Sequence, residues 1–177
     1  MAKKKILLLS DDLRLSSGVG TMSKEIVFGT IHKYDWFQVG AAIDHPESGK
    51  LVNLSEQVKK DIRPDVEEPY LKILPYNGYG NQDVIREIMK HEQPDAIMIY
   101  TDPRFWDWLF HMEHEIRQNI PIFYYNIWDD LPYPMWNEPF YESVDALFNI
   151  SKQTYNIVKN VRREIPVKDW QCTYIPH

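Results

Sequence analysis

Short runs of aliphatic and aromatic residues alternate along the chain with longer stretches in which apolar residues recur every three or four positions. The short runs predict strands of a parallel sheet, because both faces of such a strand are covered and the apolar run is continuous. The predicted strands are Ile6–Leu9, Phe37–Ile43, Leu71–Leu74, Ala96–Tyr100, Pro121–Tyr125, Ala146–Ile150 and a short last strand within Thr173–His177.

The stretches with the three-to-four spacing predict helices that pack on this sheet. The predicted helices are Gly20–Lys33, Gln82–His91, Arg104–Gln118 and Lys152–Arg163, the last of them capped by Ser151. The polar segment Asp44–Tyr70 has no clear period and is expected to carry a short hairpin or an extra helix. Strand and helix alternate about six times. We therefore predict one α/β domain over residues 1–177, a Rossmann-like parallel sheet of about six to seven strands with helices on both faces.

Composition narrows the class of protein. The chain of 177 residues has 44% hydrophobic residues, enough for a core, and 26 acidic against 20 basic residues give a formal net charge of −6. This balance argues against a nucleic acid as the main partner, because phosphate backbones require a basic face. Cys172 is the single cysteine. No intrachain disulfide can form, and no apolar run reaches the length of a membrane span, so we expect a cytoplasmic protein.

In parallel sheets, ligands bind outside the carboxyl ends of the strands. The first such exit is SDDLRLSSGVGTMSKEI (Ser10–Ile26), which is longer than a βα connection needs. Ser17, Gly18, Val19 and Gly20 stand where the helix is expected to start, so free N–H groups and small side chains would admit a ligand. A plain turn is the alternative, since neither a dinucleotide fingerprint nor a P-loop is present.

The densest group of candidate residues follows the strand Pro121–Tyr125. Asn126, Trp128, Asp129 and Asp130 leave that strand together, and an extended, proline-rich segment with aromatic residues comes next. Carboxylates accept hydrogen bonds from sugar hydroxyls, and aromatic rings cover the C–H faces of sugars. Asp102 stands at the end of another strand. The alternative is that Trp128 and Trp136 fill the core and that the two acids cap the next helix.

Two further patterns favour structural interpretations. Asp11-Asp12 after the first strand would suit a receiver domain, but the isolated Asp and the Lys expected after later strands are missing. His111 and His114 lie on a predicted helix without the HExxH spacing of a zinc site, and a solvated helix face explains them better. We predict no metal site.

The sequence resembles the N-terminal domain of two-domain nucleotide-sugar-dependent glycosyltransferases, the twin-Rossmann retaining family that includes sucrose and glycogen synthases. The resemblance covers nearly the whole chain. It rests on the order and spacing of SSGVG, DAIMIYTD, PIFYYNIWDDLPYP, DALFNISKQTYNIVKN and YIPH. The family's usual histidine after the fifth strand is not obvious, because Asn126-Ile127-Trp128 occupies that stretch.

The resemblance implies sugar transfer, with retention, from a nucleotide diphosphate sugar to an acceptor hydroxyl, with no cofactor beyond this donor substrate. Gly18 and Gly20 would lie against the diphosphate or the sugar, while Asn126 and Asp129 would act as catalytic residues. The predicted binding set is completed by Ser17, Val19, Asp102, Trp128, Asp130, Ser151 and Lys152.

The resemblance also implies a partner domain. The family's C-terminal domain holds most donor contacts, so this chain would be the acceptor-side half, inactive alone and paired with a Rossmann-like domain in cis or in trans. The alternative from another class is a non-catalytic Rossmann-like module that binds a nucleotide or a protein.

Overall fold

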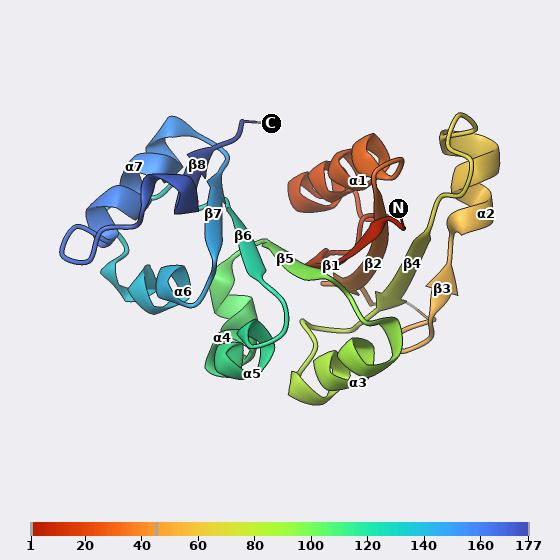
Figure 1. Ribbon diagram of the computed structural model, residues 1–177, viewed down its shortest axis with the longest axis horizontal. Coiled ribbons are helices and arrows are strands. Elements are labelled where there is room, and N and C mark those ends of the chain that lie inside the picture. The colour runs from red at the N-terminus through yellow and green to blue at the C-terminus, as the bar shows by residue number, and fades with distance from the viewer. Residues whose placement is uncertain (1, 45, 177) are drawn as a thin grey trace. The chain divides into compact units, whose positions relative to one another are not determined.

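The computed structural model describes residues 2–44 and 46–176, and these form a Rossmann-like α/β fold. Its strands are β1 (Lys4–Asp11), β2 (Tyr34–Ala41), β3 (Val52–Asn53), β4 (Leu71–Pro75), β5 (Ala96–Tyr100), β6 (Ile122–Asn126), β7 (Ala146–Asn149) and β8 (Cys172–Tyr174). The hydrogen-bonded order is β3-β4-β2-β1-β5-β6-β7-β8 (Figure 1). The strand beyond the six to seven predicted is the two-residue β3. The predicted last strand ends at Tyr174, and His177 lies outside the described residues.

The chain divides into two compact units, Met1–Ile97 and Met98–His177, and the boundary falls inside β5. Residues 1–177, expected to form one domain, therefore contain two units, each with its own buried residues. Among the described residues, no helix has both the length and the apolar character needed to cross a membrane.

The first unit is a mostly parallel sheet with helices on both faces. Its helical segments are α1 (Gly18–Thr30), α2 (Ser55–Gln57), the π-helical turn η1 (Val58–Ile62) and α3 (Gln82–Glu92). β2 pairs in parallel with β1 and with β4, while β3 runs antiparallel to β4. α1 and α3 lie on opposite faces of these strands (Figure 1). The polar insertion thus carries both an added strand and helical turns.

Small residues let α1 approach the sheet closely. Its buried positions are Gly20, Ser23 and Val27, whereas the predicted apolar positions Met22, Ile26 and Phe28 are only half-buried. The contact is partly polar, because the Ser23 hydroxyl donates to the Ser10 hydroxyl over 3.0 Å. The hydrophobic spacing therefore predicted the wrong buried face for this helix.

Ion pairs close the amino end of the first unit's strands. Glu92 accepts from the ammonium groups of Lys5 (2.8 Å) and Lys72 (3.0 Å) and from the Tyr70 hydroxyl (2.5 Å). Both ammonium groups also lie over the Tyr70 ring. Burial opposes the ionised carboxylate, but these hydrogen bonds outweigh it and lower the pKa of Glu92 to about 2. This end of the sheet is held by structural contacts, so the open chemistry lies at the carboxyl end.

The second unit holds the remaining strands and shorter helices. Its helical segments are η2 (Pro103–Trp106), α4 (Asp107–His111), α5 (Glu113–Arg117), η3 (Met135–Asn137), α6 (Glu138–Glu142), α7 (Lys152–Val161) and η4 (Asp169–Gln171). β7 pairs in parallel with both β6 and β8. α7 packs along β7 and β8, and α4 contacts α6 (Figure 1).

The single helix predicted over Arg104–Gln118 is wrong, because the chain breaks at Met112. Leu109, Met112 and Ile116 are all buried there. A regular helix that buries Leu109 would also bury the residue four positions later, Glu113. The break between the two helices buries Met112 in its place. A change of phase in the apolar pattern therefore marks the helix boundary.

Candidate functional site

The exit of β1 in the first unit is built on a buried polar network. Gln38 is fully buried, and its amide donates to the Ser10 hydroxyl (2.8 Å) and to the Asp11 carbonyl (2.9 Å). Its side-chain oxygen accepts from the Leu13 N–H over 3.2 Å. A buried side-chain amide with all of these partners fixes the path of the chain after β1.

Asp12 is sealed in the same region. Its carboxylate is fully buried and accepts from the Arg14 guanidinium at 2.9 and 2.7 Å and from the Arg14 N–H at 2.9 Å. Gly40 makes room for it, since a Cβ there would lie 2.5 Å from the Asp12 Oδ2. The bidentate pair compensates a charge that could not be buried alone. Asp12 therefore has a structural part.

The predicted glycine-rich site is the first turn of α1. Ser17 caps the helix, accepting from the Gly20 N–H over 2.9 Å. A Cβ on Gly20 would lie 2.7 Å from the Leu15 carbonyl oxygen, so this glycine is required for close packing. Gly18 is exposed with open space around it, and Val19 is half-buried. Of the four predicted residues, Gly18 and Val19 are thus the ones that a ligand can approach.

An acid stands beside this helix start. Asp11 accepts from the Ser17 hydroxyl over 3.2 Å, and burial raises the pKa of the Asp11 carboxyl despite that bond and one from Tyr79. A carboxylate here opposes the binding of a diphosphate at the positive end of the helix. The turn is better suited to a neutral, hydroxyl-bearing group.

In the second unit, the exits of β5 and β6 surround one hollow of about 260 Å³, which we call the Trp128 hollow. It is lined by Asp102, Arg104, Ile127, Trp128, Asp129 and Asp130. Four of these residues were predicted from the sequence as binding or catalytic residues, and the structure brings them together. Arg104 and Ile127 were missed, although Arg104 follows Asp102 by two positions.

An ion pair and an indole form one wall of this hollow. Asp102 accepts from the Arg104 N–H at 3.0 Å and from the Arg104 Nε at 2.9 Å, and these bonds raise the pKa of the guanidinium. The guanidinium carbon lies 5.1 Å from the centre of the Trp128 ring, a distance typical of a cation–π contact. The charges of Asp102 and Arg104 cancel, and the contact with the Arg104 guanidinium helps to hold the Trp128 indole in place.

The two remaining acids are exposed. Asp129 is fixed through its backbone, because its carbonyl oxygen accepts from the Gln153 amide. Asp130 accepts from the Leu131 N–H at 2.8 Å, and its own carbonyl accepts from the Trp128 indole N–H at 3.2 Å. The loop thus presents both carboxyl groups to solvent on an ordered backbone. Beyond the Asp102–Arg104 pair, the hollow carries two negative charges.

Asn126, expected to be catalytic, is fully buried. Its side-chain oxygen accepts from the Trp128 N–H (3.1 Å), and its amide donates to Asn149 (3.3 Å) and Tyr141 (3.4 Å). Burial raises the pKa of the Tyr141 hydroxyl, so this network stays uncharged. Asn126 therefore positions the backbone of Trp128. It does not touch a substrate, since its side chain has no exposed surface.

The alternative reading of the aromatic segment is not supported. Trp128 is half-buried and packs edge-on against Trp136, which is 57% exposed, so the pair does not fill the core. Neither acid caps the helix that follows, because Asn137 precedes α6. The proline-rich segment after Asp130, predicted to be extended, contains the turn η3 and leads into α6 at Glu138, and Tyr133 and Met135 are also exposed.

Ser151 and Lys152 start α7 as predicted. The Ser151 hydroxyl accepts from the Thr154 N–H over 2.9 Å, which caps the helix. Lys152 is exposed. Neither residue lines the Trp128 hollow.

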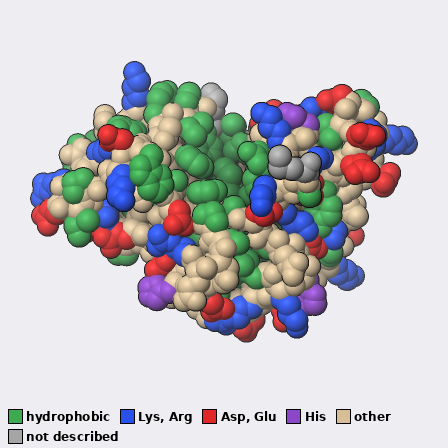
Figure 2. Space-filling view, in the orientation of Figure 1, with side chains coloured by type: hydrophobic (Ala, Val, Ile, Leu, Met, Phe, Trp, Pro, Cys, Tyr) green, Lys and Arg blue, Asp and Glu red, His purple; other side chains and the backbone are tan. Residues whose placement is uncertain are grey.

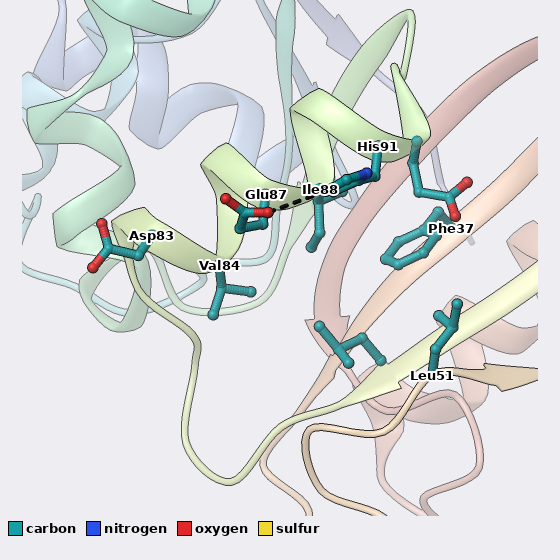
Figure 3. A pocket seen from close by; sticks show the side chains of 9 residues that line it. Phe37, Leu51, Asp83, Val84, Glu87, Ile88 and His91 are labelled. Carbon is teal, nitrogen blue, oxygen red and sulfur yellow. Dashed lines mark hydrogen bonds and ion pairs between the residues drawn. The ribbon is translucent and has the colours of Figure 1, made fainter.

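The first unit has a larger and more apolar hollow, of about 400 Å³, beside α3. Figure 3 shows Val84 and Ile88 of α3 pointing toward Phe37 and Leu51, while Asp83 points away. Its acids are engaged, for example Glu87 with His91 over 3.2 Å. We call it the α3 hollow. It offers apolar surface with few free polar groups.

The histidines and acids of the described residues are the remaining candidate metal ligands. Residues 2–44 and 46–176 contain no group of three or more His, Cys, Asp or Glu side chains placed to hold a metal ion. His111 and His114 are exposed and pair with Asp107 and Glu113, as expected for a solvated face. On the face shown in Figure 2, acidic and basic side chains are interspersed.

The fold and the strand-exit hollow define a Rossmann-like α/β protein with a polar, indole-walled site. No protein-family model and no curated protein matches the chain. Among solved structures, it is similar to a protein from Listeria monocytogenes that is provisionally described as a UDP-N-acetylglucosamine 2-epimerase, with a TM-score of 0.51 and 15% sequence identity. The match covers 97% of this chain and 44% of that one. This likeness shows the Rossmann-like fold, and the chain spans less than half the length of that protein.

Proposed function

We propose that the chain is the acceptor-side part of a nucleotide-sugar enzyme and that the Trp128 hollow binds a sugar. The observation that carries the proposal is the hollow itself, in which Asp129 and Asp130 offer exposed carboxylates beside the Trp128 ring. Carboxylates accept hydroxyl hydrogen bonds, and an indole face covers C–H groups. The similar solved structure, described as acting on a UDP-sugar, supports the same substrate class.

The charge of the hollow favours an acceptor over a diphosphate. After Asp102 and Arg104 cancel, Asp129 and Asp130 leave two negative charges, which repel phosphate oxygens. The diphosphate would be held by a Rossmann-like second domain, in cis or in trans, in keeping with the 44% coverage of the similar structure.

The proposed reaction is transfer of the sugar to an acceptor hydroxyl. The hydroxyl oxygen forms a bond to the anomeric carbon, the bond from that carbon to the diphosphate breaks, and the Asp129 carboxylate takes the hydroxyl proton. Asn126 holds the backbone that carries Trp128 through its 3.1 Å hydrogen bond. In the first unit, Gly18 and Val19 are proposed to bind a hydroxyl-bearing group through their backbone N–H groups.

Saturation-transfer NMR on the full chain tests the binding step, with UDP-N-acetylglucosamine, UDP and a simple glycoside as probes. We expect signals from the sugar protons, and at least about a tenfold weaker affinity in Trp128→Ala. Trp170→Ala is the matched control, because Trp170 is exposed and does not line the hollow. Signals from UDP alone would support the non-catalytic nucleotide module instead, and the absence of any sugar signal would reject the proposal.

Activity is tested by adding a Rossmann-like second domain and following the fate of the sugar. Transfer that requires an acceptor and is lost in Asp129→Asn supports the proposed reaction. Release of an epimer of the donor without an acceptor would indicate isomerisation, the chemistry named for the similar structure.

A further inference from the structure

The polar insertion and α1 enclose a second hollow in the first unit, of about 340 Å³, which we call the insertion hollow. α1 contributes Lys24 and Phe28, and the insertion contributes Leu54, Val58 and Ile62. The insertion was assigned no function from the sequence, and it contributes no residue to the Trp128 hollow.

The walls of the insertion hollow are tied together by hydrogen bonds. The Arg63 guanidinium donates to the Phe28 carbonyl over 2.5 Å, which joins the insertion to α1. The Leu54 N–H donates to the Leu71 carbonyl over 2.9 Å, which joins the other end of the insertion to β4. Both ends of the wall are therefore anchored, and the hollow is a built feature of the unit.

A π-helical turn shapes the outer wall. In η1 the Arg63 N–H donates to the Val58 carbonyl over 2.8 Å, five residues back. Such turns are rare and are frequently found at functional sites. Within this turn Val58 is buried while Ile62 is 39% exposed, so the wall runs from the core to the surface.

The charge at the insertion hollow is positive. Lys24 is half-buried, and no ion pair joins it to any described residue. The charge of Arg14 is already compensated by Asp12 at 2.7 Å. None of the described residues that line the hollow is acidic, whereas the α3 hollow is lined by Asp83 and Glu87.

We propose that the insertion hollow binds an anionic amphiphile with a single alkyl chain. Lys24 pairs with the phosphate or carboxylate head group, and the chain lies against Phe28, Leu54 and Ile62. A cation beside apolar walls stabilises this combination, because burial of the chain and pairing of the head group add together. The proposal does not depend on the sugar-binding function.

Isothermal titration calorimetry on the full chain, with decyl phosphate below its micellar concentration, tests the proposal. We expect a single site, no measurable binding of inorganic phosphate, and at least about tenfold weaker binding of decyltrimethylammonium, which has the same chain and the opposite charge. Equal binding of the two amphiphiles, or no saturable site, would overturn the proposal.

Variants locate the site. Lys24→Gln should weaken decyl phosphate binding about tenfold, and Gln57→Trp should block it by filling the hollow from its exposed rim. Lys60→Gln is the matched control, because Lys60 is an exposed lysine of the turn η1 that does not line the hollow. Equal losses in Lys24→Gln and Lys60→Gln would show attraction to net charge alone and would reject the site.

Vesicles separate the two sources of such a ligand. If the chain binds vesicles containing phosphatidic acid and Lys24→Gln abolishes that binding, the ligand is a membrane lipid. Binding of decyl phosphate without vesicle binding supports a soluble amphiphile. Unchanged melting temperatures of all variants are required, so that loss of binding is not loss of folding.

Discussion

The same dipeptide, Asp-Asp, stands at the exit of β1 in the first unit and after β6 in the second, and the two pairs differ in burial and in their partners. Asp12 is fully buried and bound by Arg14, and Asp11 is half-buried beside Ser17. Asp129 and Asp130 are exposed and line a hollow. The first pair shapes a loop, and the second is free to meet a ligand.

The difference comes from what surrounds each pair. Gly40 leaves space into which the Asp12 carboxylate fits, and an arginine two residues later compensates its charge. No arginine follows Asp129 and Asp130 in the loop after β6, and the nearby Arg104, at the exit of β5, pairs with Asp102. Two acids at a strand exit therefore indicate a site only when nothing nearby is built to bury them.

The largest expected effect breaks the sealed pair. Asp12→Ala should lower the free energy of unfolding by about 3 kcal/mol, because it removes one partner of a buried ion pair. Asp129→Ala should change it by less than about 0.5 kcal/mol, since that side chain is exposed. Denaturant unfolding measures both, and similar values would contradict the contrast.

A second prediction compares two glycines of the β1 exit. Gly20→Ala should cost about 2 kcal/mol, because the new Cβ would lie 2.7 Å from the Leu15 carbonyl oxygen. Gly18→Ala should be neutral or slightly stabilising, since nothing lies within 4 Å and alanine favours the helix. Chemical denaturation of the two variants checks this order. If Gly18→Ala proved the more damaging, the packing account would be wrong.

A third prediction tests whether the open exit depends on a buried amide. Asn126→Ala should lower stability by about 1.5 kcal/mol, because the Trp128 N–H and the Asn149 side chain lose their partner. It should also speed hydrogen exchange of the Trp128 amide, which NMR can follow. Unchanged exchange would show that the loop is ordered without Asn126.

The smallest effect concerns Asp11. Its pKa in the folded chain lies above the ordinary 3.8 because of burial, so the ionised carboxylate destabilises the folded state at neutral pH. Asp11→Asn should therefore raise stability at pH 7 by less than about 1 kcal/mol. The gain should vanish as pH falls below 3.8, where the carboxyl is protonated in both states. Unfolding at pH 7 and pH 3 measures it, and an equal gain at both would contradict the sign.

Most of the fold could be predicted from the sequence because its strands are continuous apolar runs, as for Ala96–Tyr100. The helix over Gln82–Glu92 was predicted to within one residue by its regular spacing. α1 was misplaced because it packs through Gly20 and Ser23, which carry no hydrophobic signal. The two-residue β3 is too short for any periodicity to show.

The site was predictable only in part. Polar residues after strands pointed to Asp102, Trp128, Asp129 and Asp130, and these do line one hollow. The burial of Asn126 was not predictable, because it depends on Tyr141 and Asn149 far along the chain. Local sequence places a residue at the edge of a sheet, but tertiary partners decide which way it faces.

The turn at Val58–Ile62 has one residue more than an α-helical turn would need. The extra residue widens the backbone of this turn. The width of the gap between the turn and α1 is therefore set by how many residues the turn contains rather than by the size of its side chains. Deleting one residue from this segment would tighten the turn and move Ile62 from its position in the lining of the hollow. A point substitution there would change the lining, whereas a deletion would change the width.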